Sequence, residues 1–315
     1  MKITVITTGG TIGCSDDGGT LRPSADLALL VRDALAVGAP GAGYDVLPLM
    51  NKLSENMTGA DIVKIAAAVK DALSGSDGVV VTHGTDTLAY TAAALSYAFG
   101  LSEKPIAIAS AAAPPSQTGS DAPLCLAACA AVAASDMRGV YACFAHGGEA
   151  DVLRASRLLP HLPYSPRLYA LGGRAAVYSD GRLRREPGYS ERGDELPAAD
   201  ITLLACPPDV TALSPNALSA LPEPPDGIRA VVFSAFHSGT LPTGVPAFAE
   251  HCARLRRRGL KLYAACSFPG VRYESAEKFA ELGIEVLPRL APAAALVKLR
   301  LRLSPSASLG GDLSP

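Results

Sequence analysis

The feature that most restricts the fold is an alternation of short apolar, β-branched segments with longer segments rich in alanine and leucine. The apolar segments are continuously hydrophobic, which is typical of strands covered on both faces. Strands that alternate with helices predict a parallel sheet with helices packed against it. In the first half of the chain we predict strands at 3–8, 46–49, 78–82, 106–110 and 139–144, and helices at 25–36, 60–73, 88–99 and 122–134.

A polar stretch then separates two α/β series. Residues 184–200 contain Pro187, Gly188, Gly193 and Pro197, which is typical of a linker. A second series follows, with predicted strands at 201–206, 230–233, 260–265 and 284–287 and a helix at 247–258. We therefore predict two three-layer α/β domains, 1–186 and 200–315, joined by a linker at 187–199. The length of 315 residues fits two domains of roughly 150 residues each.

Composition narrows the possible functions. A hydrophobic fraction of 49% and a charged fraction of 18% suit a globular enzyme with a large core. The formal net charge of −2 does not favour a polyanionic partner such as nucleic acid. The densest basic run, residues 254–258, stands directly before Gly259, so the end of a helix explains it better than an anion-binding patch.

The cysteines and the N-terminal residues indicate the cellular compartment of the protein. The seven cysteines are scattered and odd in number, which favours reduced thiols over disulfides or a zinc site. Met1 leads directly into a β-branched run, and no apolar stretch reaches membrane-spanning length without glycine, proline or charge. We expect a cytoplasmic protein with no membrane partner, no metal centre and no cofactor.

The first loop whose residues are suited to binding or catalysis is TTGGTIG, residues 7–13, directly after the opening strand. Gly9 and Gly10 let the backbone turn sharply and approach a ligand, and they leave Thr11 where open α/β sheets bind ligands. A plain tight turn and a dinucleotide-binding loop are the alternatives. The G-G-x-x-G spacing differs from the dinucleotide pattern, and the acidic residue expected at the end of a second strand is not evident.

The second loop is THGTDT, residues 82–87, between a predicted strand and a predicted helix. Capping of the helix explains one such residue, but Thr85, Asp86 and Thr87 all stand behind Gly84. The amides and dipole of a helix start can stabilise an oxyanion or a carboxylate, and Asp86 can bind a substrate ammonium group. The loop is therefore suited to an α-amino acid.

Together, TTGGTIG at 7–13 and VVVTHGTDT at 79–87 resemble the bacterial-type L-asparaginase family. The resemblance covers nearly the whole chain. It implies a larger N-terminal domain with a mostly parallel sheet and a smaller C-terminal domain with a flavodoxin- or Rossmann-like parallel sheet. It also implies hydrolysis of the side-chain amide of L-asparagine, or of a related small amide, to the acid and ammonia through an acyl-enzyme on a threonine.

The resemblance assigns roles residue by residue. Thr11 is the nucleophile, Thr85 is the second threonine of the site, and Asp86 binds the substrate α-amino group. The segment LSENM, residues 53–57, resembles the family's substrate-carboxylate loop, with Ser54 as a hydrogen-bond donor. The stretch 110–112 lies where a backbone amide would complete an oxyanion hole with the amide of Thr85. The other residues placed at the substrate are Glu55, Gly10, Gly84, Ala111 and Thr20.

The largest departure from the family concerns its catalytic lysine. No lysine occurs between Lys104 and Lys261, so the lysine is absent from its usual segment. We expect Arg154 to occupy its place among the catalytic residues. Arginine stays protonated, with a pKa above about 12, so it can orient groups and stabilise charge but cannot accept a proton.

Smaller departures affect the surrounding loops. Residues 14–23 hold no tyrosine, which in the family orients the nucleophile, and Thr20 lies near the equivalent place. Asn56, Ala113 and Cys125 stand where an aspartate, an arginine and an asparagine are usual. These changes leave the fold assignment intact and make efficient catalysis the open question.

The resemblance also implies a homodimer or homotetramer in which a neighbouring subunit completes the site. His237 and Ser238, in a polar loop after a predicted strand, are the expected contributors, and the alternative is that they are ordinary surface residues. A second hypothesis for the whole chain is a weak or inactive paralogue that binds an acidic amino acid or its amide. A nicotinamide-dependent enzyme is a third.

Overall fold

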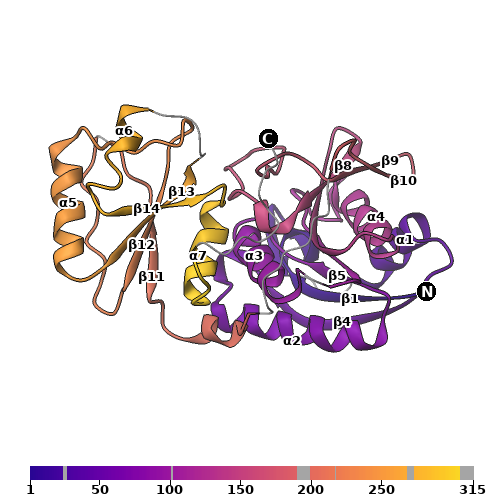
Figure 1. The fold of residues 1–315 in the computed structure, drawn as a ribbon. Helices are drawn as coiled ribbons and strands as arrows, with labels where there is room; N and C mark the ends of the chain where they lie inside the picture. The colour runs from indigo at the N-terminus through magenta and orange to yellow at the C-terminus, as the bar shows by residue number, and fades with distance from the viewer. Residues whose placement is uncertain (24–26, 101, 190–198, 217, 268–272, 306–315) are drawn as a thin grey trace.

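The computed structural model describes residues 1–23, 27–100, 102–189, 199–216, 218–267 and 273–305. Within these residues, eight strands form a large sheet in the order β10-β9-β8-β7-β6-β5-β1-β4, and four strands form a smaller sheet in the order β11-β12-β13-β14. Figure 1 shows the two sheets side by side. The strands of the large sheet are β1 (Lys2–Gly9), β4 (Gly43–Lys52), β5 (Gly78–Thr82), β6 (Pro105–Ala109), β7 (Gly139–His146), β8 (Glu149–Arg154), β9 (Ala176–Ser179) and β10 (Arg182–Arg185).

Strand direction divides the large sheet. The strands from β4 to β7 are parallel, whereas β8, β9 and β10 each run antiparallel to the preceding strand. The smaller sheet is parallel throughout. Its strands are β11 (Val210–Leu213), β12 (Ala230–Ser234), β13 (Lys261–Ser267) and β14 (Ile284–Pro288). A separate hairpin, β2 (Cys14–Asp17) and β3 (Thr20–Pro23), follows the first glycine-rich loop.

Helices cover both faces of each sheet, which confirms the predicted fold class. On the large sheet, α1 and α4 pack on one face and α2 and α3 on the other. On the smaller sheet, α5 packs on one face and α7 on the other. The helices are α1 (Ala28–Gly38), α2 (Gly59–Gly75), α3 (Leu88–Phe99), α4 (Ala122–Ala133), α5 (Pro246–Arg257), α6 (Glu274–Glu277) and α7 (Pro292–Arg300).

Helix α7 joins the two parts of the molecule. Its Ala295 and Leu299 contact the smaller sheet, while Ala294 and Val297 pack against α3. The Tyr97 hydroxyl of α3 donates to the Ala294 carbonyl at 3.1 Å. Figure 1 shows α7 between the smaller sheet and α3. Through α7, the smaller sheet is therefore packed against α3, the helix that begins directly after the THGTDT loop.

Two sequence predictions differ from the structure or lie outside it. Residues 201–206, predicted as a strand, form the 3-10 helix η4 (Ile201–Ala205) instead. The Asp200 side chain accepts from the Thr202 amide at 3.0 Å and starts this turn, and Leu204 is buried against α2 and α7. A short apolar run has no period that separates a strand from a helical turn. Most of the predicted linker, residues 190–198, lies outside the described residues.

The described part of the chain contains no helix that is both long and apolar enough to cross a bilayer.

The start of α2 is fixed by a capping box that also holds the LSENM segment. Thr58 and Asp61 exchange side-chain-to-backbone bonds, and Lys52 Nζ lies 2.6 Å from Asp61 Oδ2. Burial acts to raise the pKa of Asp61, but the hydrogen bonds from Lys52 and Thr58 outweigh it and lower the pKa from 3.8 to about 2. The carboxylate is therefore stabilised in the folded state, and with it the end of β4 and the loop that follows.

We expect Asp61→Asn to lower the free energy of unfolding by about 1–2 kcal/mol at neutral pH, because a helix cap and a charged hydrogen bond are weakened. Since the folded-state pKa is depressed, the stabilisation is fully present above 3.8 and is lost as the pH falls through about 2. Denaturant unfolding at neutral and acid pH measures both effects. Asp71→Asn, at an exposed position of the same helix, is the control. A stability difference that persists undiminished at pH 2 would contradict this assignment.

Candidate active site

The candidate site lies at the carboxyl edge of the large sheet, where the loops after β1 and β5 leave neighbouring strands. The Thr8 amide donates to Thr82 Oγ1 at 3.1 Å, and Thr8 Oγ1 donates to the Thr82 carbonyl at 2.5 Å. These two bonds fix the ends of the two strands against each other. Carboxyl ends of parallel strands are where open α/β sheets bind ligands.

Glycines let the two loops touch through their backbones. A Cβ atom on Gly10 would lie 2.3 Å from the Gly84 nitrogen, and one on Gly84 would lie 2.5 Å from Ser54 Oγ. Gly10 also has a positive φ of 77°, which L side chains rarely adopt. Its amide donates to the Lys52 carbonyl at 2.9 Å. Three loops, after β1, β4 and β5, therefore meet at contacts that exclude any larger residue.

Ser54 and Asp86 form the polar centre of this meeting point. Ser54 Oγ donates to Asp86 Oδ2 at 2.8 Å and accepts from the Asp86 amide at 3.2 Å. Thr87 Oγ1 donates to the Ser54 carbonyl at 2.8 Å. Ser54 is buried, whereas Asp86 is exposed, so a buried hydroxyl orients a carboxylate that faces solvent. Gly10, Gly84, Ser54 and Asp86 are thus brought together.

The two threonines lie on these same loops. Thr11 starts the 3-10 helix η1 (Thr11–Gly13), directly after Gly10, and Thr85 directly follows Gly84. Both are half-buried. The Gly13 amide donates to the Gly10 carbonyl at 2.9 Å, which closes the turn that carries Thr11.

Cys14 is a residue of this loop that the sequence analysis did not single out. Its Sγ donates to the Gly10 carbonyl at 3.2 Å. Burial, and then the negative charge of Glu55, raise the pKa of the Cys14 thiol, so it stays protonated and able to donate. The only sequence signal for Cys14 was its position directly after the glycine-rich motif.

His83 is a buried residue whose side chain holds the second loop in place. It is fully buried, with Nδ1 2.8 Å from the Gly84 carbonyl and Nε2 2.9 Å from Thr91 Oγ1 of α3. Because a carbonyl only accepts, Nδ1 carries the proton and Nε2 accepts from Thr91. Burial lowers the pKa of His83, which keeps the ring neutral. Its role is to hold the Gly84 backbone.

The stretch after β6 offers fewer free amides than its sequence suggested. The amides of Ala112 and Ala113 donate to the Asp121 carboxylate at 2.8 and 2.9 Å. Ala111, two residues beyond the end of β6, is fully buried. The two amides bound to Asp121 cannot also bind an oxyanion, which leaves the Ala111 amide as the candidate.

Arg154 does not lie in the candidate site, and its assignment to the lysine position is wrong. It pairs with Tyr141, near the beginning of β7, so it lies at the amino edge of the parallel strands. Its Nη1 donates to the Arg138 carbonyl at 2.9 Å and to the Tyr141 hydroxyl at 3.1 Å, and the guanidinium packs 5.3 Å from the Tyr141 ring centroid. The β7–β8 turn carries β8 away from the carboxyl edge, a reversal that the sequence analysis did not include.

The remaining predicted residues lie at exposed positions. Thr20 pairs with Asp17 at the tip of the β2–β3 hairpin. His237 and Ser238 are exposed in a loop after β12 that is closed by bonds between Phe236 and Thr240 and between Gly239 and Phe236. Their contribution to a neighbouring subunit stays a prediction.

One group in the described residues has the spacing of a metal site. Ligand atoms of His146, Glu149 and Asp151, at the β7–β8 turn, lie within 4.8 Å of one another. The Arg174 guanidinium already binds Glu149 at 3.0 Å and Asp151 at 3.1 Å, and it also contacts Glu186. The bonds to Asp151 and Glu186 raise the Arg174 pKa further. This cluster therefore has its own cation, and we interpret it as an ion-pair network.

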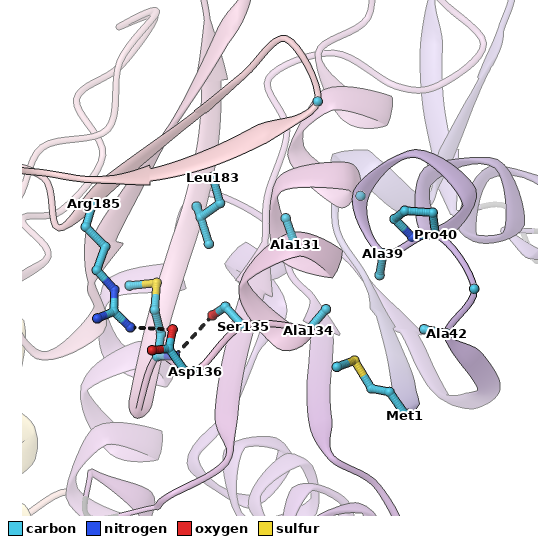
Figure 2. A pocket seen from close by; sticks show the side chains of 14 residues that line it. Met1, Ala39, Pro40, Ala42, Ala131, Ala134, Ser135, Asp136, Leu183 and Arg185 are labelled. Atoms are coloured by element: carbon cyan, nitrogen blue, oxygen red, sulfur yellow. Dashed lines mark hydrogen bonds and ion pairs between the residues drawn. The ribbon is translucent and has the colours of Figure 1, made fainter.

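A cavity of about 500 Å³ lies at the opposite edge of the sheet. Figure 2 shows that alanines and Pro40 line part of it, with the Arg185–Asp136 ion pair at one side. Met1 and Met137, which precede β1 and β7, also line it. This cavity lies at the amino ends of the strands, away from the loops that carry Thr11 and Thr85, and it is not the candidate site.

Comparison with known proteins identifies a matching family and similar proteins. Residues 2–159 match the family model described as asparaginase, N-terminal. The chain is 38% identical over 132 residues to a glutamyl-tRNA(Gln) amidotransferase subunit from Thermoplasma acidophilum, covering 39% of this chain and 29% of that protein. For the amidotransferase subunit of the same name from Methanobrevibacter smithii, the identity is 39% over 154 residues, covering 48% and 35%. The chain thus spans about a third of the length of these relatives.

Solved structures agree with the fold over the whole chain. The thermostable L-asparaginase from Thermococcus kodakarensis has a TM-score of 0.76 at 22% identity, covering 98% of this chain and 95% of that one. A probable cytoplasmic L-asparaginase from Campylobacter jejuni has a TM-score of 0.74 at 21% identity, covering 98% and 97%. The resemblance inferred from TTGGTIG and VVVTHGTDT is confirmed: with its N-terminal half matching the family model and its two α/β sheets arranged as in solved L-asparaginases, this chain belongs to the asparaginase family.

Proposed function

We propose that this chain is an amidohydrolase that converts the side-chain amide of L-asparagine, or of a related small amide, to the acid and ammonia through an acyl-enzyme on Thr11. The observation that carries the proposal is the backbone contact between Gly10 and Gly84, which holds the Thr11 loop against the loop of Thr85 and Asp86. The family supports the reaction class. The relatives named as amidotransferase subunits make glutamine a second amide to test.

Recognition of an α-amino acid follows from the charges at the site. The Asp86 carboxylate, oriented by Ser54, is suited to a substrate ammonium group. The negative charge of Glu55 also acts on the thiol of Cys14, which follows the Thr11 turn. The start of α3 lies directly behind Asp86 and Thr87, and its amides and dipole favour the substrate carboxylate. The site thus offers a carboxylate for the substrate ammonium group and the positive end of a helix for the substrate carboxylate.

The chemical step uses the groups on the two glycine loops. The Thr11 hydroxyl loses its proton to a base, and its oxygen forms a bond to the amide carbon. The amides of Thr85 and Ala111 stabilise the negative oxygen that develops, each for about 10²–10³ in rate. The carbon–nitrogen bond then breaks, the nitrogen gains the proton, and ammonia leaves. Water hydrolyses the resulting ester and restores the Thr11 hydroxyl.

A paralogue that binds an acidic amino acid or its amide without turnover is the second candidate. It is favoured by the absence of the family lysine and by the position of Arg154 at the other edge of the sheet. We also propose a homodimer or homotetramer in which His237 and Ser238 of a neighbouring subunit approach the site. Ammonia release with asparagine and glutamine separates the enzyme from the binding protein.

We expect Thr11→Ala and Thr11→Val to reduce ammonia release by about 10³-fold or more, because both remove the attacking hydroxyl. Thr11→Val keeps the shape of the side chain, so it controls for packing. The thermal midpoint should stay unchanged in both variants, since Thr11 is half-buried in a surface loop. Turnover near that of the wild type in both would assign the nucleophile to Thr85 or to water.

We expect Asp86→Asn to weaken L-aspartate binding by about 10- to 100-fold, because a hydrogen bond between charged groups is typically worth about 1.5–3 kcal/mol. Ser54→Ala should weaken it less, by up to about 10-fold, since it only frees the Asp86 carboxylate from a neutral partner. Calorimetric titration measures both dissociation constants. Thr20→Ala, at the exposed hairpin tip, tests in the same titration the substrate-binding role that the resemblance assigns to Thr20. An unchanged affinity in Asp86→Asn would remove the ammonium-binding role.

A further inference from the structure

The Thr85 amide is one of the donors that the proposed reaction uses, and its direction depends on the peptide group that joins Gly84 to Thr85. We infer that His83 and Thr91 are positioning residues that hold this peptide so that the Thr85 amide points into the site. The inference rests on the proposed function, in which that amide stabilises the developing oxyanion. Both side chains are fully buried, so they act through the backbone and do not touch the substrate.

The peptide group between Gly84 and Thr85 is held at its carbonyl. His83 Nδ1 lies 2.8 Å from the Gly84 carbonyl oxygen. A carbonyl only accepts, so Nδ1 carries the proton and donates it to this bond. The peptides of the described chain are trans, and in a trans peptide the carbonyl and the N–H lie in one plane and point in opposite directions. A bond that fixes the Gly84 carbonyl therefore also fixes the direction of the Thr85 N–H.

The carbonyl side of this peptide faces the core, which leaves the amide side facing the site. The side chains of His83 and Thr91 are buried between the end of β5 and the first turns of α3. Because the Gly84 carbonyl points toward them, the Thr85 N–H points away from this core. No hydrogen bond to the Thr85 amide occurs within the described ranges, so this amide is available to a substrate oxygen.

The Thr91 hydroxyl selects the tautomer of His83 that can donate to Gly84. Thr91 Oγ1 lies 2.9 Å from His83 Nε2. Since Nδ1 holds the one proton of the neutral ring, Nε2 accepts from Thr91. Burial lowers the pKa of His83, which keeps the ring neutral. With both nitrogens bonded, a residue of α3, the imidazole ring and the Gly84 carbonyl form one fixed series of hydrogen bonds.

The contact between the two glycine loops connects this series to the nucleophile. A Cβ atom on Gly10 would lie 2.3 Å from the Gly84 nitrogen, so the residue before Thr11 rests directly on the segment that His83 holds. In the proposed reaction the oxyanion forms on the carbon that Thr11 attacks. Rotation of the Gly84–Thr85 peptide would turn the Thr85 amide away from that oxygen.

The carboxylate of Asp86 has its own support, which separates its orientation from that of the Thr85 amide. Ser54 Oγ donates to Asp86 Oδ2 at 2.8 Å and accepts from the Asp86 amide at 3.2 Å. Loss of the His83 bond should therefore affect the chemical step more than the binding of L-aspartate. A histidine that only filled the core would not divide these two effects.

The test compares two substitutions that each keep one of the two bonds. The amide nitrogen of asparagine takes the place of histidine Nδ1, and that of glutamine takes the place of Nε2. His83→Asn can therefore still donate to the Gly84 carbonyl, whereas His83→Gln reaches only Thr91. We expect kcat for the better amide substrate to fall by about 10-fold in His83→Gln and by less than about 3-fold in His83→Asn, because the Thr85 amide is misdirected rather than removed. The dissociation constant of L-aspartate should stay close to that of the wild type in both.

Two substitutions on α3 form a matched pair. Thr91→Val and Ser96→Ala each remove a buried hydroxyl, but Ser96 Oγ donates to the Ala92 carbonyl of its own helix at 2.8 Å. We expect Thr91→Val to lower kcat by about 2- to 5-fold, because the tautomer of His83 is no longer fixed. Ser96→Ala should leave kcat unchanged. Equal effects of the two α3 substitutions on kcat would contradict the role of Thr91.

The outcomes separate the inference from the proposed function. An active wild type with equal rates in His83→Asn and His83→Gln overturns the inference alone, because a packing role does not distinguish the two nitrogens. A loss of kcat matched by an equal loss of L-aspartate affinity overturns it as well. A wild type that binds L-aspartate but releases no ammonia from either amide overturns the proposed enzyme function, and the inference falls with it.

NMR of the wild type decides the question if the His83 variants fail to fold. The ¹⁵N signals of the His83 ring should show the proton on Nδ1, and the Thr85 amide signal should shift when L-aspartate binds. A proton on Nε2, or an unmoved Thr85 amide signal, overturns the inference.

Discussion

The close approach of the Gly10 and Gly84 backbones is the contact on which the candidate site depends. Neither position has room for a Cβ atom, and the positive φ of Gly10 adds a second reason for glycine. The contact puts two threonines from distant parts of the chain on adjoining loops. Because it is made by main-chain atoms at the ends of paired strands, side-chain rotation cannot loosen it. The Ser54–Asp86 bonds then fix a carboxylate beside it.

The candidate site combines the Asp86 carboxylate, which Ser54 orients, with the half-buried side chain of Thr11. The Asp86 carboxylate supplies negative charge beside these loops, which is consistent with the proposed substrate ammonium group.

Particular residues show how far sequence reasoning reached. The strands that end at Gly9 and Thr82 and the helix at Leu88–Phe99 were predicted at or within one residue of their observed ends, because apolar runs and turn residues are local signals. Residues 201–206 were wrongly predicted as a strand, since the capping of η4 by Asp200 and its burial against α2 and α7 are not visible in six apolar residues. Arg154 was misplaced because strand direction after β7 was not considered.

The sequence by itself determined the family, the parallel α/β sheets and the two glycine-rich loops, because each depends on residue types within a few positions of one another. Only the tertiary structure decided which side chains share an edge or a face of the sheet. It separated Arg154 from the Thr11 and Thr85 loops and tied Ser54 to Asp86. The physical reason is that strand order and direction bring together residues far apart in the chain, and one reversal between β7 and β8 moves a side chain from one edge of the sheet to the other.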